Sequence, residues 1–432
     1  MTTATDRVLA PDGSAVPTAD IGAVRALAEQ KCRLAADPVN LERRDAWYSH
    51  DAGPGGRPMV LAEVGGIRDH CHPLDSLEAA CQHPWTRAVE RGLRAEIWQF
   101  EQLRDDHVIE PWDNVGWQVQ VSGYGVEVVQ HQPDFDGTLG ARSWDPPIGD
   151  LDRDLDQLCP RTYTVDRAAT LDEVARREAL FGAALPVRLR GGFWWTMGMT
   201  WTAIELIGLE GLMMAMYDHP EGLHRLMAFL RDDHLAYARW LQDEGLLSLN
   251  NENDYIGSGS MGYTRDLPAP PGETGNGHVR CADQWVLLES QETVGVGPDL
   301  FGEFIFPYQL AIAEQFGKCY YGCCEPVHSR LEVLAQLPNL SRVSVSPWAD
   351  EEVMARACGT EIAFSRKPNP TLISTGVFDE AAILADLRHT LDVARGCRVE
   401  FAMKDVHTLN DEPARLARWV ELARRAIDER PA

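Results

Sequence analysis

Residues 318–323, KCYYGC, begin the stretch of sequence that decides the fold. Two more short apolar runs follow at similar intervals, SRVSVS at 341–346 and EIAFSR at 361–366, and stretches with helical periodicity lie between them at 329–337 and 350–358. A run rich in Val, Ile or Leu followed by a turn and roughly ten residues of helical periodicity is typical of a strand–helix unit. Strands that alternate with helices pair in parallel, so this stretch predicts a parallel sheet.

The same pattern extends in both directions along the chain. Further strands are predicted at 58–63, 185–190, 245–250, 284–290 and 397–403, and further helices at 200–217, 220–243, 299–316, 379–394 and 413–428. This many strand–helix units is what a (β/α)8 TIM barrel contains. The sequence therefore predicts an α/β protein with that fold.

The predicted barrel occupies residues 56–432, and residues 1–55 form an N-terminal helical extension. A long insertion follows the first strand, and we expect it to form a cap over one end of the barrel. It spans about 64–184 and contains a predicted helix at 75–104 and an alternating stretch at 117–130 that predicts a hairpin. Residues 251–283 are rich in Gly, Pro and Asn, which predicts a mobile or functional loop at the barrel mouth.

Composition excludes some classes of function. The 432 residues include 40 Lys and Arg against 66 Asp and Glu, a net charge of -26, which argues against nucleic-acid binding because little would neutralise a row of phosphates. No apolar run approaches the ~20 residues of a membrane span and the start does not resemble a signal peptide, so we expect a soluble, cytoplasmic protein. Ten cysteines in such a chain predict reduced thiols, with metal binding or catalysis as their functional roles.

Active sites of TIM barrels are built from residues that follow the carboxyl ends of the strands. Polar and chemically reactive side chains follow the predicted strands here. A polar loop would supply some of them by chance, so the pattern favours an enzyme without establishing one. They are Glu63, Arg190, Asn250, Asn251, Glu252, Glu289, Gln291, Glu292, Cys323, Cys324, Glu325, His328, Ser346, Asp350, Arg366, Lys367, Lys404, Asp405 and His407.

The most specific local pattern is YYGCCEPVH at 320–328. Thiolate, carboxylate and imidazole are ligands that zinc prefers, and a catalytic zinc needs about three of them. Adjacent side chains of a strand face opposite ways, so we expect only one of Cys323 and Cys324 to face the site. Glu325 and, from the last strand, His407 are the other candidate ligands. The alternative is that the cysteines pack in the core and the polar side chains are solvated.

Cationic and amide side chains at the predicted mouth, together with Tyr321, are candidates for substrate binding. Arg366 and Lys367 precede two prolines, which favours binding of a carboxylate or phosphate over Schiff-base chemistry. Asn250, Asn251 and Glu252 offer donors and acceptors to a polar ligand. Solvated loop residues explain both groups equally well.

Several stretches resemble the uroporphyrinogen decarboxylase superfamily. They are MYDHPEGLHRLMAFL (216–230), ESQETVGVGPDLFGEFIFPYQ (289–309), YYGCCEP (320–326), LPNLSRVSVSPWAD (337–350), SRKPNP (365–370) and KDVHT (404–408). The chain is most similar to the decarboxylase-like branch, and more distantly similar to methylcobamide:coenzyme M methyltransferases and cobalamin-independent methionine synthase. The resemblance implies a (β/α)8 barrel.

The resemblance also implies a site. In the methyltransferase branch a His-x-Cys and a Cys from the last strand hold zinc, which binds the methyl-accepting thiol as a thiolate. Cys323 matches the first Cys, but Tyr321 stands at the His position and His407 falls near the last Cys position. Glu325 or Cys324 would have to complete the set. The arginine-rich and Asp pattern of the decarboxylase branch is absent from residues 1–70, so uroporphyrinogen decarboxylase activity is not expected.

Three hypotheses follow. The first is a zinc-dependent methyltransferase or demethylase acting on a thiol or corrinoid acceptor, with a corrinoid protein as a candidate partner and with Lys367, Asn250 and Glu289 orienting the substrate. The second is a metal-independent decarboxylase or lyase, in which Arg190, Arg366 and Lys367 bind carboxylates and Asp405 or His407 moves the proton. The third is a non-catalytic protein that binds a corrinoid or another small ligand. None of the three involves nucleic acid or a membrane.

Overall fold

The computed structural model describes residues 8–69, 72–75, 77–131, 143–268 and 278–430. Its centre is a parallel sheet of six strands, in the order β1-β14-β13-β12-β11-β10, accompanied by a two-stranded parallel pair, β2 and β7. The strands of the six-stranded sheet are β1 (Met59–Ala62), β10 (Trp285–Leu288), β11 (Lys318–Tyr321), β12 (Leu340–Val345), β13 (Ala363–Arg366) and β14 (Val399–Met403). The other strands are β2 (Asp113–Gly116), β3 (Val119–Val121), β4 (Val129–His131), β5 (Ser143–Asp145), β6 (Tyr163–Val165), β7 (Val187–Arg190), β8 (Tyr255–Gly257) and β9 (Ser260–Met261).

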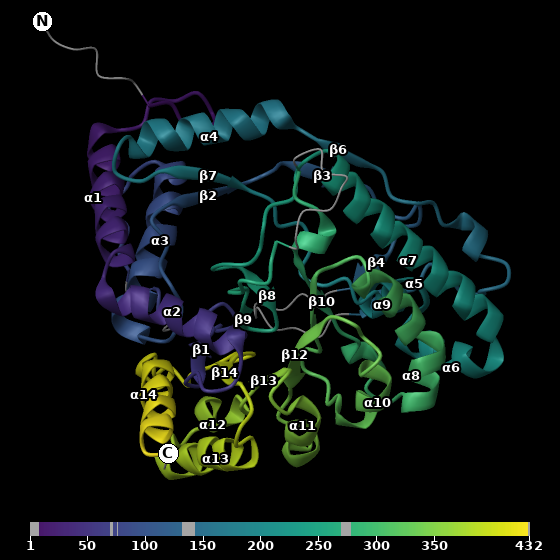
Figure 1. Cartoon of the computed structure of the whole chain (residues 1–432). Helices are drawn as coiled ribbons and strands as arrows, with labels where there is room; N and C mark the ends of the chain where they lie inside the picture. The colour runs from purple at the N-terminus through teal and green to yellow at the C-terminus, as the bar shows by residue number, and fades with distance from the viewer. Residues whose placement is uncertain (1–7, 70–71, 76, 132–142, 269–277, 431–432) are drawn as a thin grey trace, which may run out of the picture.

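Helices surround these strands (Figure 1). Those after the central strands are α8 (Pro298–Phe304), α9 (Phe306–Ala313), α10 (Leu331–Leu334), α11 (Glu351–Cys358), α12 (Thr371–Ser374), α13 (Glu380–Val393) and α14 (Ala414–Asp428). Earlier in the chain lie α1 (Thr18–Ala35), α2 (Pro38–Ala52), α3 (Pro84–Trp98), α4 (Arg167–Phe181), α5 (Thr200–Ile207), α6 (Leu209–Asp218) and α7 (Pro220–Asp243). Short helices are the π-helix η1 (Gln99–Leu103) and the 3-10 helices η2 (Leu155–Gln157), η3 (Cys281–Asp283), η4 (Gln291–Thr293) and η5 (His328–Arg330).

The parallel α/β architecture predicted from the sequence is confirmed. Every residue of β1, β10, β13 and β14 is buried, as expected for strands covered on both faces. The large apolar core cluster joins these strands to the helices around them. Among the described residues, no helix combines the length and the apolar character needed to cross a membrane.

The predicted strand at 245–250 is not a strand in the structure. The amide side chain of Asn250 explains the difference, because it pairs with the backbone of Trp285 on both sides. Its Oδ1 accepts from Trp285 N at 2.8 Å and its Nδ2 donates to Trp285 O at 3.1 Å. A side chain thus makes the contacts with β10 that a neighbouring strand would make through its backbone.

The predicted hairpin at 117–130 is also wrong. Its two halves form strands, but β3 pairs with β6 and β4 pairs with β5, each in antiparallel register. Alternation indicates a strand but does not identify its partner. The helix predicted at 75–104 begins later, at Pro84 after the cap residue His83, and ends in the π-helix η1.

The N-terminal helices pack on the inserted segment and on the sheet. α1 contacts α3 and α4, and α2 contacts β1. Asp51, at the end of α2, forms an ion pair at 3.1 Å with Arg342, a buried residue of β12. The extension is therefore tied to the interior by a buried charge pair as well as by apolar packing.

Candidate functional site

Two cysteines, a lysine and an aspartate meet beyond the carboxyl ends of β11 and β14. Cys323 Sγ lies 3.4 Å from Cys324 Sγ and 3.9 Å from Lys404 Nζ. Cys324 Sγ lies 3.2 Å from Asp405 Oδ2. Because carboxyl ends of parallel strands meet at the same edge, residues 81 positions apart in the chain come together here. We call these four residues, with Ser258, the thiol cluster.

Ser258 comes from the β8–β9 turn, which lies over the strand ends. Its hydroxyl is 3.6 Å from Cys323 Sγ and 3.1 Å from Lys404 Nζ, and its side chain is fully buried. The approach of this turn requires glycine on both sides of Ser258. A Cβ at Gly257 would lie 2.5 Å from the ring of Tyr320, and Gly259 has a φ of +89°. The Gly-rich loop predicted to lie at the mouth does so in its described part; residues 269–277 lie outside the described residues.

The surroundings of Cys323 favour its thiolate. The hydrogen bond from Cys324 and the positive charge of Lys404 outweigh the effect of burial and lower the pKa of Cys323 to about 7. The same contact raises the pKa of Cys324, so one proton stays on that sulfur. Burial alone would lower the pKa of Lys404, but the charges of Cys323, Tyr255 and Asp405 raise it overall. The pair is thus a thiolate beside an ammonium group.

Three carboxyl groups, those of Glu289, Glu292 and Glu325, follow β10 and β11, and the charge of Cys323 acts on Glu289. Burial, with the charges of Glu292 and Glu325, raises the pKa of Glu289 well above its ordinary value. Burial also raises the pKa of Glu325, although its two oxygens accept from the backbone N–H groups of Ser290 and Cys323 at 2.9 and 2.8 Å. A proton retained on Glu289 reduces the negative charge near Cys323, which makes ionisation of the thiol easier.

Lys367, at the end of β13, is buried as well. Its Nζ donates to the hydroxyl of Tyr320 at 2.8 Å and to Ser365 Oγ at 2.5 Å. Burial and the charge of Lys404 lower the pKa of Lys367 to about 8. All of its hydrogen bonds go to neutral oxygens, so the amine is poised between its charged and neutral forms at neutral pH.

The residues at this site fit the predicted zinc ligand set poorly. Within the described part of the chain, no group of three or more His, Cys, Asp or Glu side chains is arranged to hold a metal ion. Glu325 uses both oxygens on backbone N–H groups, and exposed His407 contacts Gly66 O at 3.4 Å. Lys404 places an ammonium group where a second cation would be repelled. The geometry favours a metal-free thiolate, and zinc remains a prediction from the sequence.

Other predicted substrate-binding residues are occupied by contacts within the protein. Asn250 holds Trp285, and Asn251 donates to Leu267 O at 2.7 Å. Arg190 forms an ion pair with Asp254, and Glu252 lies 3.6 Å from Arg188. The structure does not bring these four side chains to the thiol cluster.

The predicted residues at the later strand ends also contact other parts of the protein. Arg366 points to the helix layer, where it pairs with Glu351 at 2.7 Å and Asp386 at 3.3 Å. The hydroxyl of buried Tyr321 donates to Gln309 Oε1 at 2.8 Å. The remaining polar residues make these contacts: Ser346 with Trp348 N, Asp350 with Val353 N, His328 with Asp350 N, Gln291 N with Glu289 Oε2, Glu292 with Thr200 Oγ1, and Glu63 with the hydroxyl of Tyr255.

Ser258 and Tyr255 were missed by reasoning from strand ends. Tyr255 donates to Glu63 Oε1 at 3.1 Å and accepts from Gly259 N at 2.7 Å, so it braces the turn that carries Ser258. The only sequence signal was the Gly and Ser content of residues 257–260 within a loop expected at the mouth.

Comparisons with known proteins are sparse. No protein-family model matches the chain, and no curated protein matches it. A solved structure of a methyltransferase from Methanosarcina mazei is similar at 14% sequence identity and a TM-score of 0.48, covering 90% of this chain and 98% of that chain. A similarity at this level carries no argument about activity.

Proposed function

We propose that this protein is a methyltransferase that acts on a small thiol substrate and uses the Cys323 thiolate as its general base. The observation that carries the proposal is the Cys323–Lys404 contact at 3.9 Å, where a buried sulfur is held as a thiolate near neutral pH. The sequence resemblance supplies the class of reaction. A base whose pKa lies near the working pH is the most effective one.

The proposed step needs only groups that the site holds. Cys323 takes the proton from the substrate S–H, and the substrate sulfur then attacks the methyl carbon of the donor. A sulfur–carbon bond forms, and the bond from the methyl carbon to its leaving atom breaks, with the electron pair departing on that atom. The proton on Cys323 passes to the leaving group or to water. The ammonium group of Lys404 stabilises the negative sulfur throughout.

A thiol methylation assay tests this proposal. Purified protein is incubated with small thiols and with methylamines, methyl ethers or methylcobalamin as donors, and the thioether is measured by mass spectrometry. Cys323→Ser should lose about 100-fold or more of the activity, because a serine hydroxyl stays neutral at this pH and is a far weaker base than the Cys323 thiolate. Cys159→Ser, at an exposed cysteine, is the matched control and should be unchanged. Full activity of Cys323→Ser, or a methyl group found on Cys323 itself, contradicts the proposal.

We also propose that the two parallel sheets close into the barrel that the sequence predicts. Hydrogen bonds outside the strand ladders connect the segments that lie between the two sheets. Asp106 N donates to Val60 O at 2.7 Å, beside β1. On the other side, Gly191 N donates to Ser248 Oγ at 2.9 Å, and Asn250 pairs with Trp285 of β10. Residues 246–250 thus take the position of a strand between β7 and β10 without forming its ladder.

A further inference from the structure

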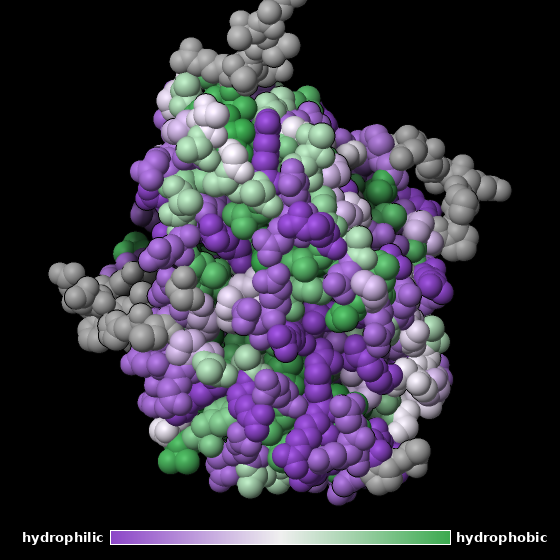
Figure 2. Space-filling model, turned by 90° about the vertical axis from the view of Figure 1, so that its left-hand side faces the viewer, coloured by the Kyte–Doolittle hydropathy of each residue, from purple (hydrophilic) through white to green (hydrophobic). Residues whose placement is uncertain are grey.

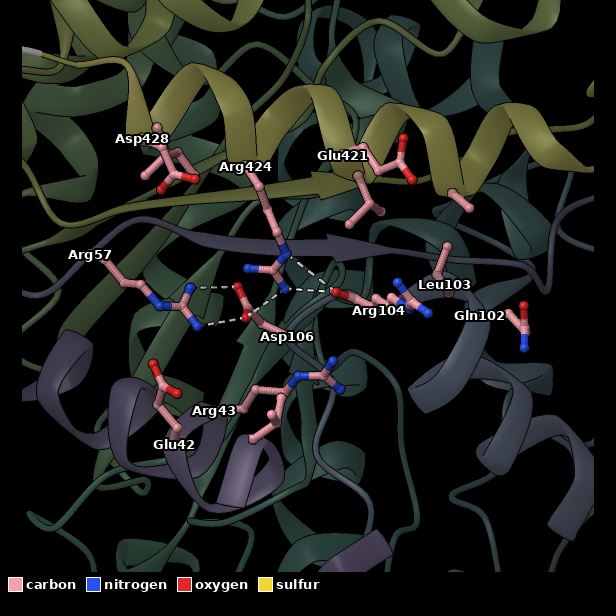
Figure 3. Close-up of a pocket in the computed structure, with 14 residues that line it drawn as sticks. Glu42, Arg43, Arg57, Gln102, Leu103, Arg104, Asp106, Glu421, Arg424 and Asp428 are labelled. Carbon is pink, nitrogen blue, oxygen red and sulfur yellow. Dashed lines mark hydrogen bonds and ion pairs between the residues drawn. The ribbon is translucent and has the colours of Figure 1, made fainter. Parts of the chain in front are cut away.

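A groove of about 740 Å³ between α2 and α14 satisfies its own charges. Arg57 contacts both oxygens of buried Asp106, at 2.8 and 2.7 Å, and Arg424 contacts Oδ1 at 3.0 Å (Figure 3). The charges of Asp105 and Asp106 also act on Arg43. The face of the molecule that carries α2 and α14 is largely hydrophilic (Figure 2). The charged side chains of this groove therefore neutralise one another and do not indicate a ligand.

The thiol cluster, in contrast, holds a second thiol that the proposed methyl transfer does not consume. Cys324 Sγ lies 3.4 Å from Cys323 Sγ, and a disulfide would bring the two sulfurs to about 2.05 Å. Both sulfurs reach the cluster, whereas alternation along a strand would turn one of them away. The chain leaves the extended conformation just before them, at Gly322, whose φ of +94° lies in the left-handed region. The two cysteines are thus placed to react with each other.

The pair of sulfurs is open to solvent on the side of Cys324. Cys323 is 3% exposed, but Cys324 is half-buried, and the side chain of its neighbour Asp405 is 48% exposed. A small uncharged molecule can approach from this side, because the carboxylate of Asp405 does not repel it as it would repel an anion. Hydrogen peroxide and small organic hydroperoxides are molecules of this kind, and they oxidise thiolates.

We propose that Cys323 is a site of reversible oxidation by hydroperoxides, with Cys324 as the thiol that closes a disulfide with it. In the first step the Cys323 thiolate attacks an oxygen of the hydroperoxide. The sulfur–oxygen bond forms and the oxygen–oxygen bond breaks, with the electron pair leaving on the second oxygen, which takes a proton from water. The hydrogen bond from Cys324 and the ammonium group of Lys404, 3.9 Å from Cys323 Sγ, favour this step because they keep the thiolate populated near neutral pH.

The second step involves the proton on Cys324. The hydrogen bond to Cys323, burial and the charge of the Cys323 thiolate raise the pKa of Cys324, and oxidation of Cys323 removes that charge. Asp405 Oδ2, 3.2 Å from Cys324 Sγ, is placed to take the proton. The sulfur of Cys324 then attacks that of Cys323. The disulfide forms, the sulfur–oxygen bond breaks, and the departing hydroxide takes the proton from Asp405 and leaves as water. Both thiols are thereby oxidised, and the hydroperoxide is reduced to an alcohol and water, or to water alone.

The disulfide would be easy to reduce. The Cα atoms of adjacent residues lie about 3.8 Å apart, below the range of about 4.4–6.8 Å that disulfides usually span. A strained disulfide is reduced more readily by small thiols, so the oxidation is reversible. While the disulfide lasts, Cys323 has no thiolate to accept a proton, and this loss of methyl transfer is the one part of the inference that rests on the proposed function.

Peptide mass spectrometry of the full chain tests the site. The protein is treated at neutral pH with a small excess of hydrogen peroxide, quenched with acid and digested without reduction. The peptide that carries both cysteines should lose the mass of its thiol hydrogens and regain it after dithiothreitol. Its oxidation should be about tenfold or more faster than that of Cys159, an exposed thiol in the same sample, because the thiolate is the reacting form. Cys324→Ser has no thiol to close the disulfide, so it should retain a sulfenic acid on Cys323 that dimedone traps.

Cys159→Ser is the matched control and should form the disulfide at the rate of the unchanged protein. Absence of the disulfide overturns the proposal. A stable sulfenic acid on Cys323 in the unchanged protein, or oxidation no faster than that of Cys159, overturns it as well.

Methyl transfer is measured on the same samples, so that the two proposals fail separately. It should fall about tenfold or more when the disulfide forms and return with dithiothreitol, since the base is lost and restored. Disulfide formation in a protein without methyl transfer contradicts the proposed function and supports the oxidation site. Normal methyl transfer without a disulfide contradicts the oxidation site alone, and full methyl transfer by the oxidised protein contradicts the regulation.

Discussion

At the level of single residues, the chemistry of the site depends on which of its buried groups are protonated at neutral pH. Cys323 gives up its proton near pH 7, while Glu289 keeps its proton far above the range of an ordinary carboxyl. The two effects support each other, because an ionised Glu289 would raise the pKa of Cys323. At neutral pH, Glu289 is therefore the neutral partner of this pair and Cys323 is the charged one.

The raised pKa of Glu289 makes the free energy of unfolding depend on pH. Between its ordinary pKa of 4.5 and its raised value, the folded protein holds a proton that the unfolded chain has released. Stability should therefore fall as pH rises through that window, by up to about 1.4 kcal/mol per pH unit. Glu289→Gln has no proton to lose, so urea unfolding from about pH 5 to pH 8 should show a flatter profile. Glu29→Gln, on an exposed position of α1, should leave the profile of the unchanged protein. A profile in Glu289→Gln as steep as that of the unchanged protein would show that Glu289 is not the group responsible.

At the scale of elements, the turn between β8 and β9 decides whether the thiol cluster forms. Gly257→Ala forces a Cβ to within 2.5 Å of the Tyr320 ring, which should cost about 1–3 kcal/mol and displace Ser258. Urea unfolding measures the loss. Gly123→Ala is the control, since nothing lies within 4 Å of the position of its Cβ. Equal stability of the two variants would mean that the turn does not pack as described.

The sequence predicted the strands of this site better than the loops over it. Buried runs such as those of β11 and β14 carry an apolar pattern, so Cys323, Lys404 and Asp405 could be placed at strand ends. The contacts of Ser258 could not be predicted, because they depend on how a loop 65 residues distant folds back over Cys323. The directions in which adjacent side chains point could not be predicted from the sequence either. Arg366 and Lys367 are adjacent, yet Arg366 pairs with Glu351 in the helix layer and Lys367 contacts Tyr320 inside the sheet.

At the scale of the whole molecule, buried charges connect the N-terminal helices to the sheet. Arg342 is fully buried and pairs with Asp51 of α2 at 3.1 Å and with Glu400 of β14 at 3.3 Å. Hydrophobic patterning gives no sign of such a pair, because Arg342 lies in a strand that reads as apolar only at alternate positions. The extension that the sequence suggested as a separate segment is joined to the interior through this residue.

Removal of Arg342 tests whether its ion pairs connect the N-terminal helices to the sheet. Arg342→Met should lower the free energy of unfolding by about 3–5 kcal/mol, because buried Glu400 loses its ion pair with an arginine and buried Asp51 keeps only its longer ion pair with Lys318, at 3.6 Å. Arg418→Met, which removes an exposed pair with Glu380, should change it by less than about 1 kcal/mol. Denaturant unfolding measures both. Similar small losses in the two variants would mean that the buried pairs do not hold the extension in place.

Lys404 and Cys324 together hold Cys323 as a thiolate at neutral pH. A pH titration of thiolate ultraviolet absorbance, taken as the difference between the protein and Cys323→Ser, measures the pKa of this thiol. We expect a transition near pH 7 that moves upward by about one unit in Lys404→Met, since the loss of a nearby positive charge disfavours the anion. A transition at or above the ordinary thiol value of 9.0, or one that Lys404→Met leaves in place, would contradict it.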